Sequence, residues 1–258
     1  MRNTCKKERI GETRKNKEEL GSYKMKIVEY NNSHDIIIEF QDKHKVRVHT
    51  NYNNFIEGSV KNPYHPFIYD VGYIGVGKYN AKEHRRIWDT WHDMLKRCYD
   101  PYYINKTPSY IDCYVEKHLH NFQNFAKWYE ENYYEAFEER MHLDKDILCK
   151  GNKIYSTETC IFVPQRINVL FTKSNKMRGE YPIGINYYKK YNCLVTRCNT
   201  LEKRIHLGYF SLDEPFKAFT TYKNFKENYI KKVADEYKEL IPQKLYEALY
   251  KYEVEIND

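Results

Sequence analysis

Residues 141–168, MHLDKDILCKGNKIYSTETCIFVPQRIN, constrain the fold of this chain more than any other stretch. Residues 143–147 predict a short strand, and residues 160–163 predict a second, apolar strand. Lys150-Gly151-Asn152 lies between them and supplies Gly and Asn, which adopt positive φ most readily in turns. Pro164 then suits the first turn of a helix that continues to Leu170. The segment therefore predicts a strand, a loop, a second strand and a helix.

Two oxygen-bearing side chains stand at positions of this segment where they can converge. Asp144 lies at the end of the first predicted strand, and Asn168 lies on the predicted helix. Carboxylate and amide oxygens are ligands that Mg²⁺ and Mn²⁺ prefer, and one such ion can promote phosphodiester hydrolysis. The segment thus predicts a one-metal site held by Asp144 and Asn168. The alternative is a solvated acidic hairpin without a metal.

The same segment resembles the ββα-metal motif of HNH endonucleases, in a variant that reads LDRID, Gly, Tyr, Asn-Cys and a final Asn. By this resemblance Asp144 is the metal-binding aspartate, Asn168 is the final metal-proximal residue, and Thr159 replaces the asparagine that ties down the loop. Lys145 stands where the family has its general-base histidine, and a protonated amine cannot accept a proton from water. His142 shares a strand face with Asp144, so it is either a substitute base or a neighbour.

The resemblance therefore implies a catalytic set with four members, namely Asp144, His142, Lys145 and Asn168. Part of the preceding region strengthens it. Residues 81–99 and 121–133 predict amphipathic helices, and residues 110–115 predict a strand between them. Their Trp, Met, Cys and Phe residues resemble the region before the catalytic hairpin in the same HNH subfamily. We therefore expect residues 80–171 to form an HNH-like domain.

The composition bounds the class of protein. With 258 residues, 41% of them apolar, the chain can build one large core or several small ones. It has no apolar run of membrane-spanning length, and residues 1–21 lack the apolar stretch of a signal peptide. We therefore expect a cytoplasmic protein without membrane contact. The seven cysteines are scattered and form no C-x-x-C pair, which is typical of reduced thiols and does not favour a structural zinc site.

The charge balance favours a polyanionic partner. Lys and Arg number 43 against 36 Asp and Glu, which gives a net charge of +7, and aromatic residues make up 16% of the chain. A basic chain rich in tyrosine suits nucleic acid, which offers both negative charge and stackable bases. An A+T-rich coding genome produces the same bias toward Tyr and Lys, so composition alone does not decide between these explanations.

The N-terminal part predicts an arm followed by a small β-module. Residues 1–22 are charged without a periodic apolar pattern and predict a flexible basic arm. Residues 23–66 predict the β-module, with strands at residues 25–30, 35–40 and 46–50.

The C-terminal part predicts a second recognisable unit at residues 181–237. Strands are expected from Ile183, from Cys193 and from Ile205, followed by an aromatic helix that begins near Asp213. This order resembles the plant ethylene-response-factor (APETALA) type of DNA-binding domain, which implies a three-stranded antiparallel sheet backed by one helix. Residues 238–258 predict a C-terminal helix interrupted at Pro242. The expected fold class is therefore α+β.

The same resemblance implies that the open face of this sheet enters the major groove of duplex DNA. Polar and basic residues on the strands and their turns would make the contacts, namely Asn186, Tyr188, Lys190, Thr196, Arg197, Lys203 and Arg204. The first strand carries Asn and Tyr where the plant domains have clustered Arg. A structural mini-domain with a solvated face is the alternative.

Together these features predict a site-specific, metal-dependent endonuclease of the homing type found in phages and mobile introns. Its partner would be double-stranded DNA, its cofactor Mg²⁺ or Mn²⁺, and its location the cytoplasm of a bacterial host. The alternative is a catalytically impaired relative that acts as a sequence-specific DNA-binding or regulatory protein. Lys145 favours this alternative, because a cation there would pair with phosphate. The target sequence, the number of strands cut and the oligomeric state are left open, and a monomer is compatible with all of this.

Overall fold

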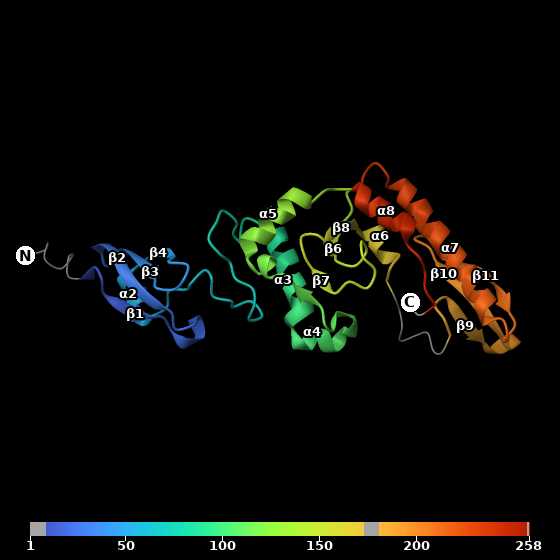
Figure 1. Ribbon diagram of the computed structural model, residues 1–258, viewed down its shortest axis with the longest axis horizontal. Helices are drawn as coiled ribbons and strands as arrows, with labels where there is room; N and C mark the ends of the chain where they lie inside the picture. The colour runs from blue at the N-terminus through green and yellow to red at the C-terminus, as the bar shows by residue number, and fades with distance from the viewer. Residues whose placement is uncertain (1–8, 173–180, 257) are drawn as a thin grey trace, which may run out of the picture. The chain divides into compact units, whose positions relative to one another are not determined.

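The computed structural model describes residues 9–172, 181–256 and 258. The chain divides into two compact units, Met1–Glu130 and Glu131–Asp258. Each unit combines helices with small antiparallel sheets (Figure 1), so the expected α+β class is confirmed. The boundary between the units falls inside the region 80–171 that the sequence predicts as one domain. In the described part of the chain, no helix has both the length and the apolar character needed to cross a membrane.

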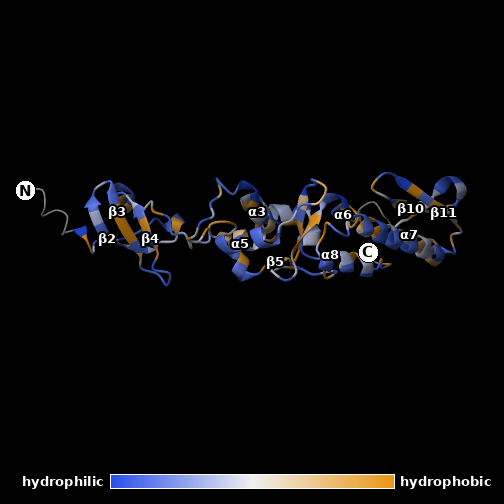
Figure 2. Cartoon of the chain, turned by 90° about the horizontal axis from the view of Figure 1, so that it is seen from above, coloured by the Kyte–Doolittle hydropathy of each residue, from blue (hydrophilic) through white to orange (hydrophobic). Residues whose placement is uncertain are grey.

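The first unit opens with a four-stranded antiparallel sheet in the order β1-β2-β3-β4. Its elements are β1 (Thr13–Lys15), β2 (Lys24–Asn32), β3 (Asp35–Phe40) and β4 (Arg47–Thr50), followed by helix α2 (Tyr52–Glu57). Alternate residues of β2 and β3 are buried, and they form a core with Phe55 of α2. The apolar stretch along β3 is visible in Figure 2. The three strands predicted from periodicity are present.

Strand β1 corrects the expected flexible arm of residues 1–22. Thr13 pairs with Lys26 and Lys15 with Lys24, so this part of the arm is the edge of the sheet. Asn16 is buried, and its side-chain amide donates to the carbonyl of Val60 at 3.2 Å. All three residues of β1 are exposed, so the strand is held by backbone hydrogen bonds and leaves no apolar alternation to detect. Residues 1–8 lie outside the described part of the chain.

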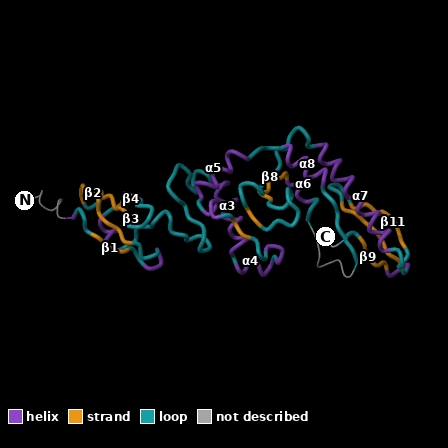
Figure 3. The backbone as a smooth tube through the Cα atoms, viewed as in Figure 1, coloured by secondary structure: helices purple, strands orange, loops and turns teal. Residues whose placement is uncertain are grey.

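The rest of the first unit is mainly helical and follows a long loop after α2 (Figure 3). It contains α3 (Arg85–Tyr99), α4 (Pro101–Lys106), β5 (Tyr114–Val115) and α5 (Phe122–Asn132), with short 3-10 turns at Pro108–Tyr110 and Lys117–His120. Trp91 of α3 is fully buried, and its Nε1 donates to the carbonyl of Leu119 at 2.8 Å. The expected strand at residues 110–115 is wrong before Tyr114, because Tyr110 ends a 3-10 turn and Asp112 has a φ of +64°.

The second unit begins with a hairpin and a short helix. Strand β6 (Met141–Asp144) pairs antiparallel with β8 (Ile161–Pro164), with Asp144 opposite Ile161. Strand β7 (Ile154–Tyr155) lies in the connection, and helix α6 (Gln165–Val169) follows β8 directly. The first strand ends at Asp144 and not at Ile147 as predicted.

The unit continues with a three-stranded antiparallel sheet in the order β11-β10-β9. Its elements are β9 (Ile185–Tyr188), β10 (Cys193–Asn199) and β11 (Arg204–Phe210), with a 3-10 turn at Lys189–Tyr191, and the helices α7 (Pro215–Glu236) and α8 (Gln243–Lys251) follow. Gly184 precedes β9 with a φ of +81°, and a Cβ there would collide with the Tyr222 ring of α7. Only glycine lets the first strand lie this close to the helix.

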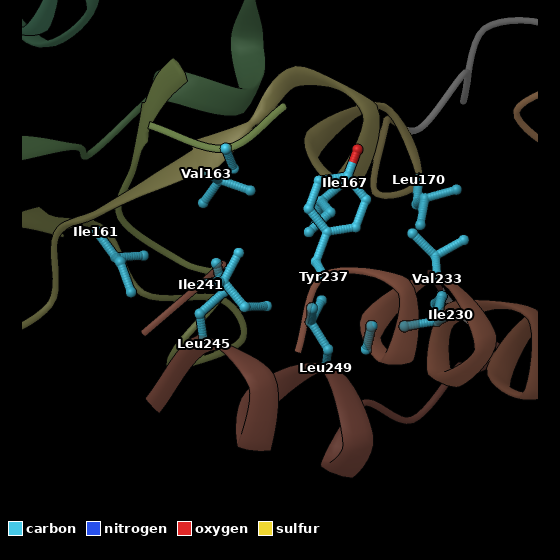
Figure 4. Packing of buried hydrophobic residues seen from close by; sticks show 12 residues of the cluster. Ile161, Val163, Ile167, Leu170, Ile230, Val233, Tyr237, Ile241, Leu245 and Leu249 are labelled. Carbon is cyan, nitrogen blue, oxygen red and sulfur yellow. The ribbon is translucent and has the colours of Figure 1, made fainter. Parts of the chain in front are cut away.

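Helix α7 belongs to two cores at once. Near its start, Ala218, Phe219 and Tyr222 are buried against the three-stranded sheet. Near its end, Ile230, Val233 and Tyr237 pack with the hairpin, α6 and α8 (Figure 4). The hairpin and the C-terminal sheet are therefore joined through one helix and are not separate bodies.

Candidate functional site

A cavity of about 480 Å³, here called the hairpin cavity, lies beside the connection between β6 and α6. Asp144 of β6 and Asn168 of α6 both line it, although they are far apart in sequence. The other polar side chains on its wall are those of Asp146, Lys150, Thr172, Glu255 and Asp258. Four of its lining residues are acids and one, Lys150, is a base that pairs with Glu255 and Asp258, so acidic groups are in excess on its wall.

Asp144 is held by the backbone that follows it. Its Oδ1 accepts hydrogen bonds from the N–H of Asp146 at 2.8 Å and from the N–H of Ile147 at 2.7 Å. This Asx-type turn competes with strand pairing and ends β6 at Asp144. Burial and, after it, the nearby carboxylate of Asp146 raise the pKa of Asp144 from its ordinary value of 3.8 to about 6, against the lowering effect of the two N–H groups and Lys145.

Asn168 is oriented by His142. The Asn168 side-chain amide donates from Nδ2 to His142 Nδ1 at 3.0 Å. His142 lies on β6 opposite Val163, on the strand face that Asp144 also shares. Because His142 takes the amide nitrogen of Asn168, the amide oxygen is the atom that Asn168 can offer to a cation. The geometry brings His142, Asp144 and Asn168 together, as expected from the sequence, while the chemical role of each stays a prediction.

Lys145 does not line the hairpin cavity. Its side chain is only 8% exposed, and its Nζ lies 3.3 Å from Asp146 Oδ2 and 5.9 Å from the centroid of the Tyr155 ring. The amine thus lies against Asp146 and near the Tyr155 ring. Lys145 is therefore not positioned to act as a base toward a group bound beside Asp144.

The loop of the hairpin is tied down by Thr159 and by Asn152. Thr159 Oγ1 donates to the carbonyl of Ile154 at 2.8 Å. Asn152 Nδ2 donates to the carbonyls of Lys145 and Ile154, both at 2.7 Å. Thr159 is thus one of the side chains that hold the loop. Asn152 also holds the loop. The sequence predicts it only as a turn residue, because hydrogen bonds to carbonyls on both sides of the loop leave no local sequence pattern.

The hairpin cavity could offer a cation only a few ligands. In residues 9–172, 181–256 and 258, no three His, Cys, Asp or Glu side chains are grouped closely enough to hold a metal ion. Asp144 and Asn168 would therefore supply two oxygen ligands. Mg²⁺ commonly binds through one or two protein oxygens together with water and substrate phosphates, so this sparse set fits Mg²⁺ or Mn²⁺ and not a structural metal.

A segment distant in sequence forms one wall of the cavity. Lys150 Nζ lies 2.8 Å from Asp258 Oδ2 and 3.4 Å from Glu255 Oε1, and it also donates to the carbonyl of Glu253 at 2.8 Å. Tyr252 packs edge-on against Phe171, with 4.8 Å between ring centroids. Sequence reasoning missed Glu255 and Asp258 because no local pattern connects residues more than 100 positions from Lys150.

The second candidate region is the face of the three-stranded sheet opposite α7, here called the open sheet face. Arg197 stands opposite His206, Asn199 opposite Arg204, and Asn186 opposite Val195. Directly opposed residues share a face, and Arg204 is exposed while Asn186, Tyr188 and Arg197 are half-buried. Lys190 and Lys203 are exposed in the connections between strands. These predicted DNA contacts are on accessible surface.

Thr196 is a correction to that set. It is fully buried, and its Oγ1 donates to the carbonyl of Ala218 on α7 at 3.4 Å. Adjacent residues of a strand point to opposite faces, so Thr196 and Arg197 cannot both face DNA. The sequence also missed His206 and Tyr209, which share the open sheet face because the register of β11 against β10 shifts between Thr196 and Arg197. Strict alternation would have put these two residues on opposite faces.

The open sheet face lies next to the hairpin cavity. Asn186, Arg197 and Arg204 line a second cavity of about 380 Å³. Four residues border both cavities, namely Phe171, Thr172, Tyr252 and Asp258. The two cavities therefore share part of their walls.

Comparison with known proteins gives no significant match to a family model, a curated protein or a solved structure.

Proposed function

We propose that this chain is a metal-dependent DNA endonuclease whose centre is the hairpin cavity and whose open sheet face holds DNA. One observation carries the proposal: Asp144 and Asn168, from β6 and α6, line one acidic cavity that shares walls with the cavity of Arg197 and Arg204. Acids that attract a divalent cation beside arginines that attract phosphate are the combination that phosphodiester hydrolysis needs.

The residues divide the work between them. Asp144, fixed through Oδ1 by two N–H groups, would bind the cation through its other carboxylate oxygen. Asn168 would add its amide oxygen, which His142 directs by engaging the amide nitrogen. A bound Mg²⁺ or Mn²⁺ would supply the positive charge that stabilises a developing phosphate dianion and its leaving oxygen. Arg197 and Arg204 would hold the phosphodiester backbone.

A supercoiled-plasmid assay with Mg²⁺ or Mn²⁺ tests the proposal. The parent chain should nick or linearise plasmid, and Asp144→Ala should not. Asp93→Ala is the matched control, because Asp93 is an exposed acid on α3 of the first unit and lines neither cavity. Cleavage that survives Asp144→Ala at the parent rate would contradict the proposal.

A second function is favoured by one observation, the position of Lys145. Its amine forms an ion pair with Asp146, and Lys145 does not line the hairpin cavity. The residue at the position of the family's general base is therefore not part of this cavity. On this alternative the chain binds duplex DNA as a regulator and does not cut it. Salt-sensitive duplex binding without any metal-dependent nicking would support the alternative.

A further inference from the structure

Four aromatic rings gather on the open sheet face. Tyr188 stacks near Tyr209 with 5.8 Å between centroids and an interplanar angle of 29°. Tyr191 meets both edge-on, at 5.3 Å from Tyr188 and 6.0 Å from Tyr209. His206 completes the group at 4.6 Å from Tyr209. We call Tyr188, Tyr191, His206 and Tyr209 the aromatic platform.

The platform presents ring surface to solvent. Tyr191 is 58% exposed and Tyr209 is 51% exposed. Val195 of the central strand stands opposite Tyr209 and Asn186 and is 1% exposed, so side chains on this face cover it. The inner sides of the rings thus close the sheet, and their outer sides offer flat apolar area that no described element covers.

Basic groups lie on the same sheet face and at its edge. Lys190 Nζ lies 5.1 Å from the centroid of the Tyr191 ring. Arg197 stands opposite His206 across the strands, and Arg204 begins the same strand as His206. Flat rings with a cationic rim match a ligand that has flat rings and an anionic backbone. A nucleic acid strand has both, whereas an apolar peptide or a second copy of this basic chain does not satisfy the rim.

We propose that the aromatic platform stacks on unpaired bases, so that the open sheet face prefers single-stranded or locally opened DNA to closed duplex. The inference rests on the proposed DNA binding of this chain. Bases in a closed duplex show only their edges in the grooves, while an unpaired base shows its whole face. An exposed ring can use that face, and the basic rim holds the phosphates on either side.

Fluorescence anisotropy with the full-length chain tests this at one fixed salt concentration. Three labelled DNAs of about 16 nucleotides are compared, a single strand, its duplex, and a duplex with an unpaired central bubble. The parent should bind the single strand and the bubble about tenfold more tightly than the duplex, because only these expose base faces.

Variants locate the effect. Tyr209→Ala and Tyr191→Ala should each weaken single-strand binding by about tenfold without changing its salt dependence, since stacking displaces no counterions. Tyr209→Phe keeps the ring and should bind like the parent. Tyr187→Ala is the matched control, because Tyr187 is 46% exposed but stands opposite the buried Leu194, on the α7 side of the sheet. Circular dichroism confirms that each variant is folded.

The outcomes separate this inference from the proposed function. Equal affinity for the three DNAs, with Tyr191→Ala and Tyr209→Ala behaving like Tyr187→Ala, would overturn the stacking platform and leave duplex binding standing. No affinity for any of the DNAs would overturn both. A parent dimer that Tyr209→Ala converts to monomer, with unchanged DNA affinity, would assign the face to self-association and would also overturn the inference.

Discussion

The hairpin cavity and the open sheet face use opposite physical means. In the cavity, few polar groups act, and each is fixed: two N–H groups hold Asp144, and His142 holds Asn168. On the sheet face, rings and cations are half-buried or exposed and are spread over three strands and their connections. A catalysed reaction needs oriented groups in a site that is partly shielded from water, whereas binding a polymer depends on many weak contacts.

This difference predicts which property a single substitution changes in each region. Removing one fixed group from the cavity should remove most of a reaction and little binding. Removing one group from the sheet face should reduce binding partially and leave the reaction of bound DNA intact. Helix α7, which packs under both regions, makes the two sites one structural unit.

The largest expected effect separates the regions most sharply. Asn168→Ala should lower the cleavage rate by about 100-fold or more, because one of two protein oxygens for the cation is lost. Duplex affinity without metal should stay within about twofold, since Asn168 is not on the sheet face. Plasmid cleavage at saturating protein and anisotropy measured side by side check this. Loss of both properties together would show that the two regions do not act separately.

The next effect concerns pH and belongs to the cavity alone. The pKa of Asp144 is raised from 3.8, the value of an ordinary aspartate in the unfolded chain, to about 6 in the folded chain. At a pH between these two pKa values, the folded state binds more protons than the unfolded state. The contribution of Asp144 to stability is therefore complete below pH 3.8 and is lost as the pH rises through about 6. The loss should be about 3 kcal/mol. Urea unfolding with EDTA, for the parent and Asp144→Asn, measures it as the difference between the two pH profiles.

A pH profile that is the same for parent and Asp144→Asn would contradict the buried, proton-binding carboxyl. Saturating Mg²⁺ should flatten the parent profile near neutral pH, because the cation stabilises the ionised carboxylate in the folded state.

The sheet face should show a smaller and differently shaped effect. Replacing Arg197 and Arg204 together with Gln should weaken duplex binding by about tenfold and reduce the salt slope by about 2, because each phosphate contact contributes about 0.9 to that slope. The cleavage rate at saturating protein should not change. An unchanged salt slope would show that these arginines do not contact phosphate.

The smallest effect is at the rim of the cavity. Lys150 bonds to Asp258 and Glu255, but its side chain is 32% exposed and that of Glu255 is 67% exposed. The pair with Glu255 should contribute little, but Lys150→Met removes the ion-pair partner of Asp258, whose side chain is only 6% exposed, so it should cost about 1 kcal/mol in unfolding free energy. It should also speed proteolysis within residues 252–258, which limited digestion detects. Lys153→Met is the control, because Lys153 is a nearby lysine that does not line the cavity.

Much of the local structure was predictable because it depends on neighbours in sequence. The alternation of β2 and β3, the turn at Gly151 and the helix after Pro164 are all visible in residue order. The meeting of Asp144 and Asn168 at one cavity follows from the same local elements, since β6, β8 and α6 are consecutive apart from one short strand.

What sequence reasoning missed depends on partners that are distant or on side-chain direction. Strand β1 shows no apolar pattern because only its backbone is used. Lys145 does not line the cavity because its amine forms an ion pair with Asp146 and lies near the Tyr155 ring. Thr196 was placed on the wrong face because residue type was considered without the two-residue period of the strand. The wall contributed by Asp258 requires a contact that spans most of the second unit.

Binding of Mn²⁺ in the absence of DNA tests the central claim most directly. Titration calorimetry, with electron paramagnetic resonance to count bound ions, is applied to the parent, Asp144→Ala, Asn168→Ala and the control Asp93→Ala. We expect the parent and Asp93→Ala to bind one Mn²⁺, and the two cavity variants to bind it at least about tenfold more weakly. Equal Mn²⁺ binding by all four proteins, or none by the parent, would contradict a metal centre at Asp144 and Asn168.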